Sequence, residues 1–266
     1  MVGADPRNLF LLIVAGSGVV AMSFVAPIPQ DPAYHEFADQ RTLLGVPNFW
    51  NVFTNLPFGL VGVYGLAAKH RLHPSVSGTA FTTLCIGVFL VAVGSSYYHI
   101  DPSTATLFWD RLPMTIAFMA LFSIVVGDRI SRRLGDTLLW PLVAVGIASA
   151  AYWYWTELQG QGDLRMYVLV QFLPMLLIPL LLGLYRGKGI NAIWLWSTLG
   201  IYVHAKIAEH FDHFFYEIAW LSGHSLKHLL ASLAVFLVLL AVFLVPQTDR
   251  QRVTGIRLPG SGEHVP

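Results

Sequence analysis

The stretch GTAFTTLCIGVFLVAVGSSYYH, residues 78–99, decides the fold of this chain. It contains no Asp, Glu, Lys or Arg, and it is long enough to form a transmembrane helix, which needs about 20 largely apolar residues. The stretch ends in a polar cluster that runs from Ser95 to His99. Ionisable groups at the edge of a span are expensive and usually face a cavity or a partner. The pattern therefore predicts a membrane helix that carries functional groups at one end.

The whole chain has the composition of a membrane protein. Of its 266 residues, 55% are hydrophobic and only 12% are charged, whereas about 25% are charged in soluble domains. The formal charge of +1, with no basic stripe, argues against nucleic acid as a partner. Cys85 is the single cysteine and lies in an apolar run, so it has no disulfide partner and we assign it to packing.

Eight apolar runs are candidate membrane spans, and they are too long for the ten-residue alternation of a β-barrel. They lie at residues 9–28, 49–68, 78–98, 106–127, 138–156, 166–185, 191–209 and 223–245. We therefore predict an all-α polytopic transmembrane bundle, with a seven-helix core and one extra N-terminal helix. The expected units are an N-terminal span and loop at 1–35, a core domain at 36–245 and a cytoplasmic tail at 246–266. The first run also fits a signal peptide ending near Ala21-Met22-Ser23, although its length favours retention.

Charged loops predict the orientation of the bundle. The basic residues fall on one side of the eight-span map, which the positive-inside rule assigns to the cytoplasm. They are Lys69, Arg71, Arg129, Arg132, Arg133, Arg186, Lys188, Arg250, Arg252 and Arg257. The opposite loops are mainly acidic, with Arg41 and Arg165 as exceptions. We expect both termini in the cytoplasm and the end that carries His99 at the outer face.

Four ionisable residues from distant parts of the sequence share that outer end. His99 ends the third span, Asp110 in FWDRLPM begins the fourth, and His224 and His228 begin the eighth. The spacing i,i+4 places the last two on one helix face, about 6 Å apart along the axis. Three imidazoles and a carboxylate are the usual inventory of a catalytic zinc site with one open position. We therefore favour a metal site over four unrelated interfacial groups.

These motifs also carry a family resemblance. Ser-x3-His at Ser95 and His99, an Asp eleven residues later and a late His-x3-His together resemble the CREST superfamily of integral-membrane hydrolases. That group includes alkaline ceramidases and the adiponectin/progestin-type receptors. PNFWNVFTNLPF at residues 47–58 is similar to the ceramidase segment that opens the first core helix. The resemblance covers about residues 36–245 and is nearest to a bacterial-type alkaline ceramidase, which implies the bacterial inner membrane.

The resemblance implies a role for each residue, and the chemistry supports these roles. His99, His224 and His228 would bind Zn²⁺ through neutral imidazoles and leave the fourth position to water, whose pKa zinc lowers to about 7. Asp110 would accept the proton of that water and pass it to the departing amine. Ser95 would donate a hydrogen bond to the water or to the developing oxyanion. The expected activity is hydrolysis of the N-acyl bond of ceramide, a sphingolipid, or of a similar membrane lipid.

Two alternatives remain open at the level of sequence. The chain could be a non-catalytic seven-helix receptor-like protein with a structural zinc, or a zinc-dependent lipid ester hydrolase. Ser95 and Asp110 favour an enzyme, because a structural zinc site needs no proton-handling groups and more often has four protein ligands. Whether the bond is an amide or an ester does not follow from this chemistry.

Two further groups of polar residues are less decisive. The resemblance implies a possible Ca²⁺ site at residues 35–41 and Asn48, but this segment has few acids, and calcium prefers several charged oxygen ligands. A second patch lies at the end of the seventh span and comprises His204, Lys206, Glu209, His210, Asp212 and His213. We interpret it as an amphipathic interfacial loop. The alternative is that Glu209 or Asp212 orients a zinc-bound imidazole.

Overall fold

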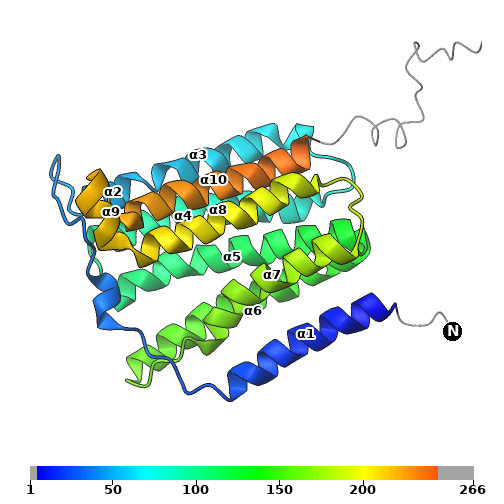
Figure 1. Ribbon diagram of the computed structural model, residues 1–266, viewed down its shortest axis with the longest axis horizontal. Helices are drawn as coiled ribbons and strands as arrows, with labels where there is room; N and C mark the ends of the chain where they lie inside the picture. The colour runs from blue at the N-terminus through cyan, green and yellow to red at the C-terminus, as the bar shows by residue number, and fades with distance from the viewer. Residues whose placement is uncertain (1–4, 245–266) are drawn as a thin grey trace, which may run out of the picture.

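The computed structural model describes residues 5–244, which form one bundle of long helices that run along a common direction (Figure 1). The element order is α1 (Pro6–Ser23), η1 (Pro32–His35), α2 (Phe49–Phe53), α3 (Leu56–Ala67), η2 (Ala68–Arg71), α4 (Gly78–Ile100), α5 (Thr104–Arg129), α6 (Arg132–Leu158), α7 (Arg165–Leu184), α8 (Ala192–His210), α9 (Asp212–Ala219) and α10 (Gly223–Phe243). The described residues contain no β-strand beyond one isolated bridge. The predicted all-α bundle is thus confirmed.

Six of the described helices are long and apolar enough to cross a membrane, namely α1, α4, α5, α6, α7 and α10. The chain is therefore an integral membrane protein. Several of these helices begin where the sequence supplies a capping side chain. Ser77, Ser131 and Ser222 each accept a backbone N–H of the first turn of α4, α6 and α10, and Ser103 forms a capping box with Thr106 on α5. Such caps satisfy donors that the helix itself leaves unpaired.

Three of the eight expected spans differ from the expectation. The first, expected at residues 9–28, is α1, which ends at Ser23. Residues 49–68 do not form one helix but two, α2 and α3, and α3 has only 12 residues. The break follows from Pro57, which has no N–H to donate to the carbonyl four residues earlier. The expected span at 191–209 is the continuous helix α8, but Lys206, Glu209 and two histidines reduce its apolar character, and it is not among the six apolar helices.

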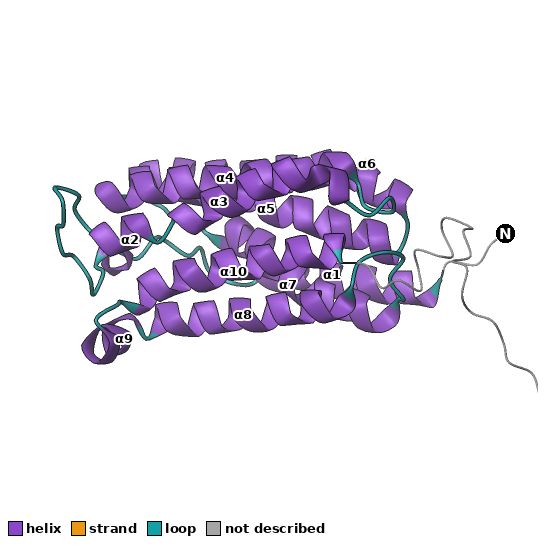
Figure 2. Ribbon diagram, turned by 90° about the horizontal axis from the view of Figure 1, so that it is seen from above, coloured by secondary structure: helices purple, strands orange, loops and turns teal. Residues whose placement is uncertain are grey.

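The helices that carry the candidate site residues pack closely against their neighbours. α4 lies between α3 and α5, and α8 lies along α10 (Figure 1). α2 and α9 lie at the same end of the bundle in both views (Figure 2). Cys85 is 1% exposed within the core, as its assignment to packing predicts. A Cβ on Gly94 of α4 would overlap the carbonyl oxygen of Trp109 on α5, so glycine alone permits this approach.

The N-terminal helix α1 is attached to one edge of the bundle. It packs on α7, and Leu11 is its only buried residue within the described part of the chain. The expected division into residues 1–35, 36–245 and 246–266 stays a prediction. The expected tail at 246–266 lies outside the described residues.

Candidate metal centre and the cavity beside it

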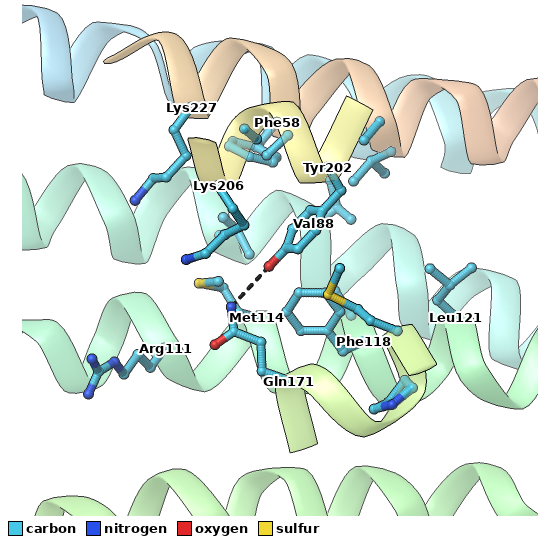
Figure 3. A pocket seen from close by; sticks show the side chains of 18 of the residues that line it. Phe58, Val88, Arg111, Met114, Phe118, Leu121, Gln171, Tyr202, Lys206 and Lys227 are labelled. Atoms are coloured by element: carbon cyan, nitrogen blue, oxygen red, sulfur yellow. Dashed lines mark hydrogen bonds between the residues drawn. The ribbon is translucent and has the colours of Figure 1, made fainter. Parts of the chain in front are cut away.

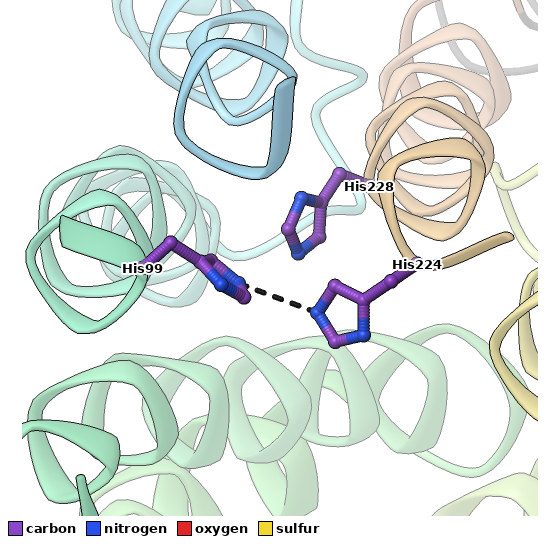
Figure 4. A group of neighbouring side chains, drawn as sticks. All are labelled: His99, His224 and His228. Carbon is purple, nitrogen blue, oxygen red and sulfur yellow. Dashed lines mark hydrogen bonds between the residues drawn. The ribbon is translucent and has the colours of Figure 1, made fainter. Parts of the chain in front are cut away.

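Three histidines from two helices meet at the end of the bundle that carries α2 and α9. His99 comes from the end of α4, and His224 and His228 come from the first turns of α10 (Figure 4). Their exposed fractions are 1%, 5% and 4%, and the ring centroids of each pair lie 4.9 Å apart. One nitrogen from each ring lies within 4.8 Å of the other two. The sequence thus predicted correctly which imidazoles come together.

The spacing of these nitrogens fits a bound divalent cation. Nε2 of His99 and Nε2 of His224 lie 3.3 Å apart. Two nitrogens at 2.0–2.1 Å from a tetrahedral zinc ion are separated by about 3.3–3.4 Å. This spacing therefore fits a metal ion, and imidazole suits zinc and several other divalent metals.

The hydrogen bond of His228 leaves one of its ring nitrogens available as a ligand. Its Nδ1 lies 3.1 Å from Oγ1 of Thr54, and the Thr54 hydroxyl donates to the carbonyl of Trp50 at 2.6 Å. The hydroxyl has one proton, so it must accept from Nδ1–H of His228. This assignment leaves the lone pair on Nε2, and such an outer partner is typical of metal-bound imidazoles. The break between α2 and α3, which ends α2 just before Thr54, is therefore part of the site.

A segment that we call the strap, residues 30–48, crosses the centre from outside. The ring centroid of Phe37 lies 4.7 Å from that of His99 and 4.6 Å from that of His224. Asn48 donates from Nδ2 to the carbonyl of His99 at 2.9 Å. Burial, and secondarily the Arg111 guanidinium, lower the pKa of His35 below its ordinary value of 6.5. The strap therefore covers His99 and His224 with the ring of Phe37.

Ser95 and Asp110 lie together beside the centre. Ser95 follows Gly94 on α4 and Asp110 follows Trp109 on α5, so the close approach of Gly94 to Trp109 brings their two helices together here. Both residues line one cavity, and His228 lines it too. The structure therefore brings all five of the sequence-predicted site residues to one end of the bundle, and three of them share a cavity wall.

This cavity has a volume of about 280 Å³ and extends from His228 into the bundle. Its lining is mostly apolar and comes from α3, α4, α5, α7, α8 and α10. Phe118 and Leu121 lie towards one end, whereas Arg111, Lys206 and Lys227 lie towards the other (Figure 3). An apolar chamber with a few polar groups at one end suits a lipid tail attached to a polar head.

The polar patch at the end of α8 belongs to this site in part, which corrects the interfacial-loop interpretation. Glu209 accepts from Lys227 at 2.8 Å and from Lys206, inside the cavity. Asp212 accepts the backbone N–H of His224 at 2.7 Å, so it positions the first turn of α10. Glu209 and Asp212 are thus structural partners of the centre, but neither contacts an imidazole nitrogen in the described hydrogen bonds. The remaining histidines of the patch are exposed: His204, His210 and His213.

Several residues of the site were not predicted from the sequence. Tyr34 and Phe37 belong to the strap, and Thr54 lies at the break between α2 and α3. Arg111 and Lys227 were visible as charges inside apolar sequence, directly after Asp110 and directly before His228. That signal could have identified the two cations, because a charge inside a membrane span is a functional candidate by default.

The segment of the expected calcium site has other contacts. Asp39 is fully buried, and Arg41 donates to its two carboxylate oxygens at 2.9 and 2.6 Å. The Asn48 side chain is committed to the carbonyl of His99. Among the described residues, the three histidines are the one group of His, Cys, Asp or Glu side chains with the geometry for a metal ion. Calcium stays a prediction from the family resemblance.

Fold and site together define an integral-membrane protein with a buried three-histidine centre that opens on a lipid-sized apolar cavity. A family model described as Ceramidase matches residues 44–185, more than half of the chain, so the protein belongs to the ceramidase family. The match confirms the resemblance to alkaline ceramidases and includes Ser95, His99 and Asp110. Membership of the ceramidase family identifies this chain as a hydrolase that acts on amides, with a lipid as substrate. A comparison with curated proteins found no match.

Proposed function

We propose that this protein is a zinc-dependent intramembrane amidase that cleaves the N-acyl bond of ceramide or a similar N-acyl lipid. One observation carries the proposal: His228, Ser95 and Asp110 line the same apolar cavity, so a metal ligand and a proton-handling pair face one substrate space. A Zn²⁺ ion held by His99, His224 and His228 would supply Lewis-acid polarisation and a water of lowered pKa. The remaining chemistry belongs to side chains of this chain.

Asp110 would move the proton in this reaction. Water adds to the acyl carbon and the C–N bond breaks, so one proton must leave the water and one must reach the nitrogen. A carboxylate on the cavity wall can do both, first as general base and then as general acid. The Ser95 hydroxyl lines the same cavity and would donate its one proton to the developing oxyanion.

The cavity and the strap would place the lipid. The apolar lining around Phe118 and Leu121 would take the acyl chain, while the amide would lie at the end with Ser95 and Asp110. Phe37 covers His99 and His224 and would keep bulk water from the imidazoles. Exclusion of water strengthens the electrostatic interactions that remain inside a site.

The proposal is tested by incubating the purified protein in liposomes with a panel of N-acyl lipids and matched lipid esters. We expect release of free fatty acid from at least one N-acyl lipid, loss of this activity with a chelator, and recovery on addition of Zn²⁺. Cleavage of esters alone would replace the amidase by a lipid ester hydrolase. A fully metal-loaded protein that cleaves neither class would leave the receptor-like alternative.

We further propose that the bundle lies in the inner membrane with both termini in the cytoplasm and the metal centre near the outer face. Single cysteines introduced in the loops near Arg132 and Arg186 should then react with an impermeant thiol reagent only after the cells are permeabilised. Cysteines near Asp101 and Gln161 should react without permeabilisation. The alternation of basic and acidic loops is the reason for this expectation. Labelling of both classes from the same side would contradict the orientation.

A further inference from the structure

Arg111 is a buried cation that the proposed reaction does not use. It follows Asp110 on α5, is 7% exposed and lines the cavity. Its Nη1 is buried without a hydrogen-bond partner, and no carboxylate of residues 5–244 lies within 4.0 Å of its guanidinium. A guanidinium keeps its charge in proteins, and a buried charge without a partner is costly. A ligand that brings an anion would remove this cost.

Aromatic rings hold the Arg111 guanidinium in place. Its central carbon lies 4.2 Å from the ring centroid of Trp153, 4.9 Å from that of Tyr167 and 5.5 Å from that of Tyr34. Cation–π contacts of this kind stabilise the charge in part and fix the plane of the group. They do not use its N–H donors, which stay available for an oxyanion in the plane of the fork.

The other charged side chains of the cavity do not provide an anion for Arg111. Lys206 and Lys227 share a single carboxylate, that of Glu209, which also accepts from the Tyr34 hydroxyl at 3.3 Å. Asp110 is the other carboxylate among the residues that line this cavity. Three cations therefore face two anions, and Figure 3 shows the cations at the same end of the cavity. An anionic substrate head would offset positive charge at this end of the cavity.

We propose that the amine half of the substrate carries a carboxylate close to the scissile amide, as in an N-acyl amino acid, and that Arg111 binds this carboxylate. This inference rests on the proposed amidase function and narrows its substrate class. Arg111 and Asp110 line the same cavity, so a lipid whose amide lies at Asp110 can place an anionic head at Arg111. A planar carboxylate matches the flat guanidinium fork, which lies against aromatic rings. A neutral head such as that of ceramide would leave Arg111 without an anionic partner.

The inference is tested with three substrates that share one acyl chain: an N-acyl glycine, its methyl ester and an N-acyl aminomethylphosphonate. We expect kcat/KM for cleavage of the amide to be at least about tenfold higher for the carboxylate than for the methyl ester. Arg111→Gln should reduce kcat/KM for the carboxylate substrate by about 10–100-fold, which corresponds to the loss of a hydrogen bond to a charged group. It should change kcat/KM for the methyl ester by less than about threefold. Arg111→Lys, which keeps the charge, should retain part of the preference.

Arg132→Gln is the matched control, because Arg132 is an exposed arginine paired with Asp136 on the surface. It should leave all three rates unchanged. Equal rates for acid and ester in the wild type, or an equal loss of both in Arg111→Gln, would overturn the inference. A preference for the phosphonate would also overturn it, in favour of a more highly charged head.

A binding measurement separates this inference from the proposed function. A fluorescent N-acyl glycine should bind the wild-type protein with a Kd at least about tenfold lower than that of its methyl ester, and Arg111→Gln should remove the difference. If no N-acyl lipid is cleaved but this binding preference is present, the amidase proposal fails while the anion site stands. If an N-acyl lipid is cleaved but the acid and its ester bind equally well, the anion site fails while the amidase proposal stands.

Discussion

Replacement of Asp110 by Asn is expected to reduce turnover by about 10²–10⁴-fold while the metal stays bound. Asn keeps the shape of the side chain, but its amide cannot take a proton from water. The three imidazoles that would hold the ion are untouched by this change. The loss therefore reports basicity rather than folding or metal binding.

The measurement combines fatty-acid release from liposomes with elemental analysis of the same purified sample. Asp136→Asn is the matched control, because Asp136 is an exposed carboxylate paired with Arg132, and it should retain full activity. Ser95→Ala should slow turnover less than Asp110→Asn, since it removes one hydrogen bond and leaves the base in place. Loss of the metal from Asp110→Asn would make Asp110 a ligand and contradict the proposed role. Turnover at the wild-type rate would exclude it as the base.

Loss of bound metal is the expected result of His224→Ala. The wild-type protein should carry about one zinc ion per chain, as a three-histidine site with an open position requires. Removal of a ligand should cost more than the 10–100-fold in affinity that is typical for loss of an outer partner. Since His99 and His228 would remain as only two ligands, the variant should lose most of its zinc during purification, and its activity with it.

Elemental analysis after treatment with a chelator and reloading checks this expectation. His204→Ala is the control, because His204 is an exposed histidine on α8 whose Nδ1 bonds the carbonyl of Gly200, and it should bind metal as the wild type does. A double variant of His224 and His228 that still binds one ion per chain would show that the metal lies elsewhere. Thermal unfolding of the metal-free protein would separate loss of the ion from loss of the fold, because a ligand that binds the folded state alone stabilises it.

Local patterns were sufficient for most of the helices. Uninterrupted apolar runs produced α4, α5, α6, α7 and α10 close to the expected bounds, because in a membrane each backbone polar group must be satisfied within its own helix. The exception is the run at 49–68, where Pro57 breaks the helix into α2 and α3. The prediction of one continuous span follows the apolar composition of this run and does not take Pro57 into account. The break places Thr54 within hydrogen-bond distance of His228.

The site residues were predictable where they lie on the same helix or at the same depth in the membrane. The i,i+4 pair of His224 and His228 follows from helix geometry alone, and Ser95 lies one turn before His99 for the same reason. That His99 comes to this pair from another helix was an inference from matching membrane depth. The close histidine spacing then depended on how α4 and α10 pack, which no local pattern encodes.

By itself, the sequence determined that this chain is a membrane helical bundle with three imidazoles and a carboxylate at one end. Hydrophobic length and helical periodicity act within one segment, so they can be read along the chain. The tertiary structure alone decided which charges remain unbalanced in the cavity. Lys227 pairs with Glu209 on another helix, whereas Arg111 contacts aromatic rings and has no carboxylate of residues 5–244 within 4.0 Å. Such pairings depend on distances of a few ångströms between separate helices, because electrostatic and cation–π contacts decay over that range.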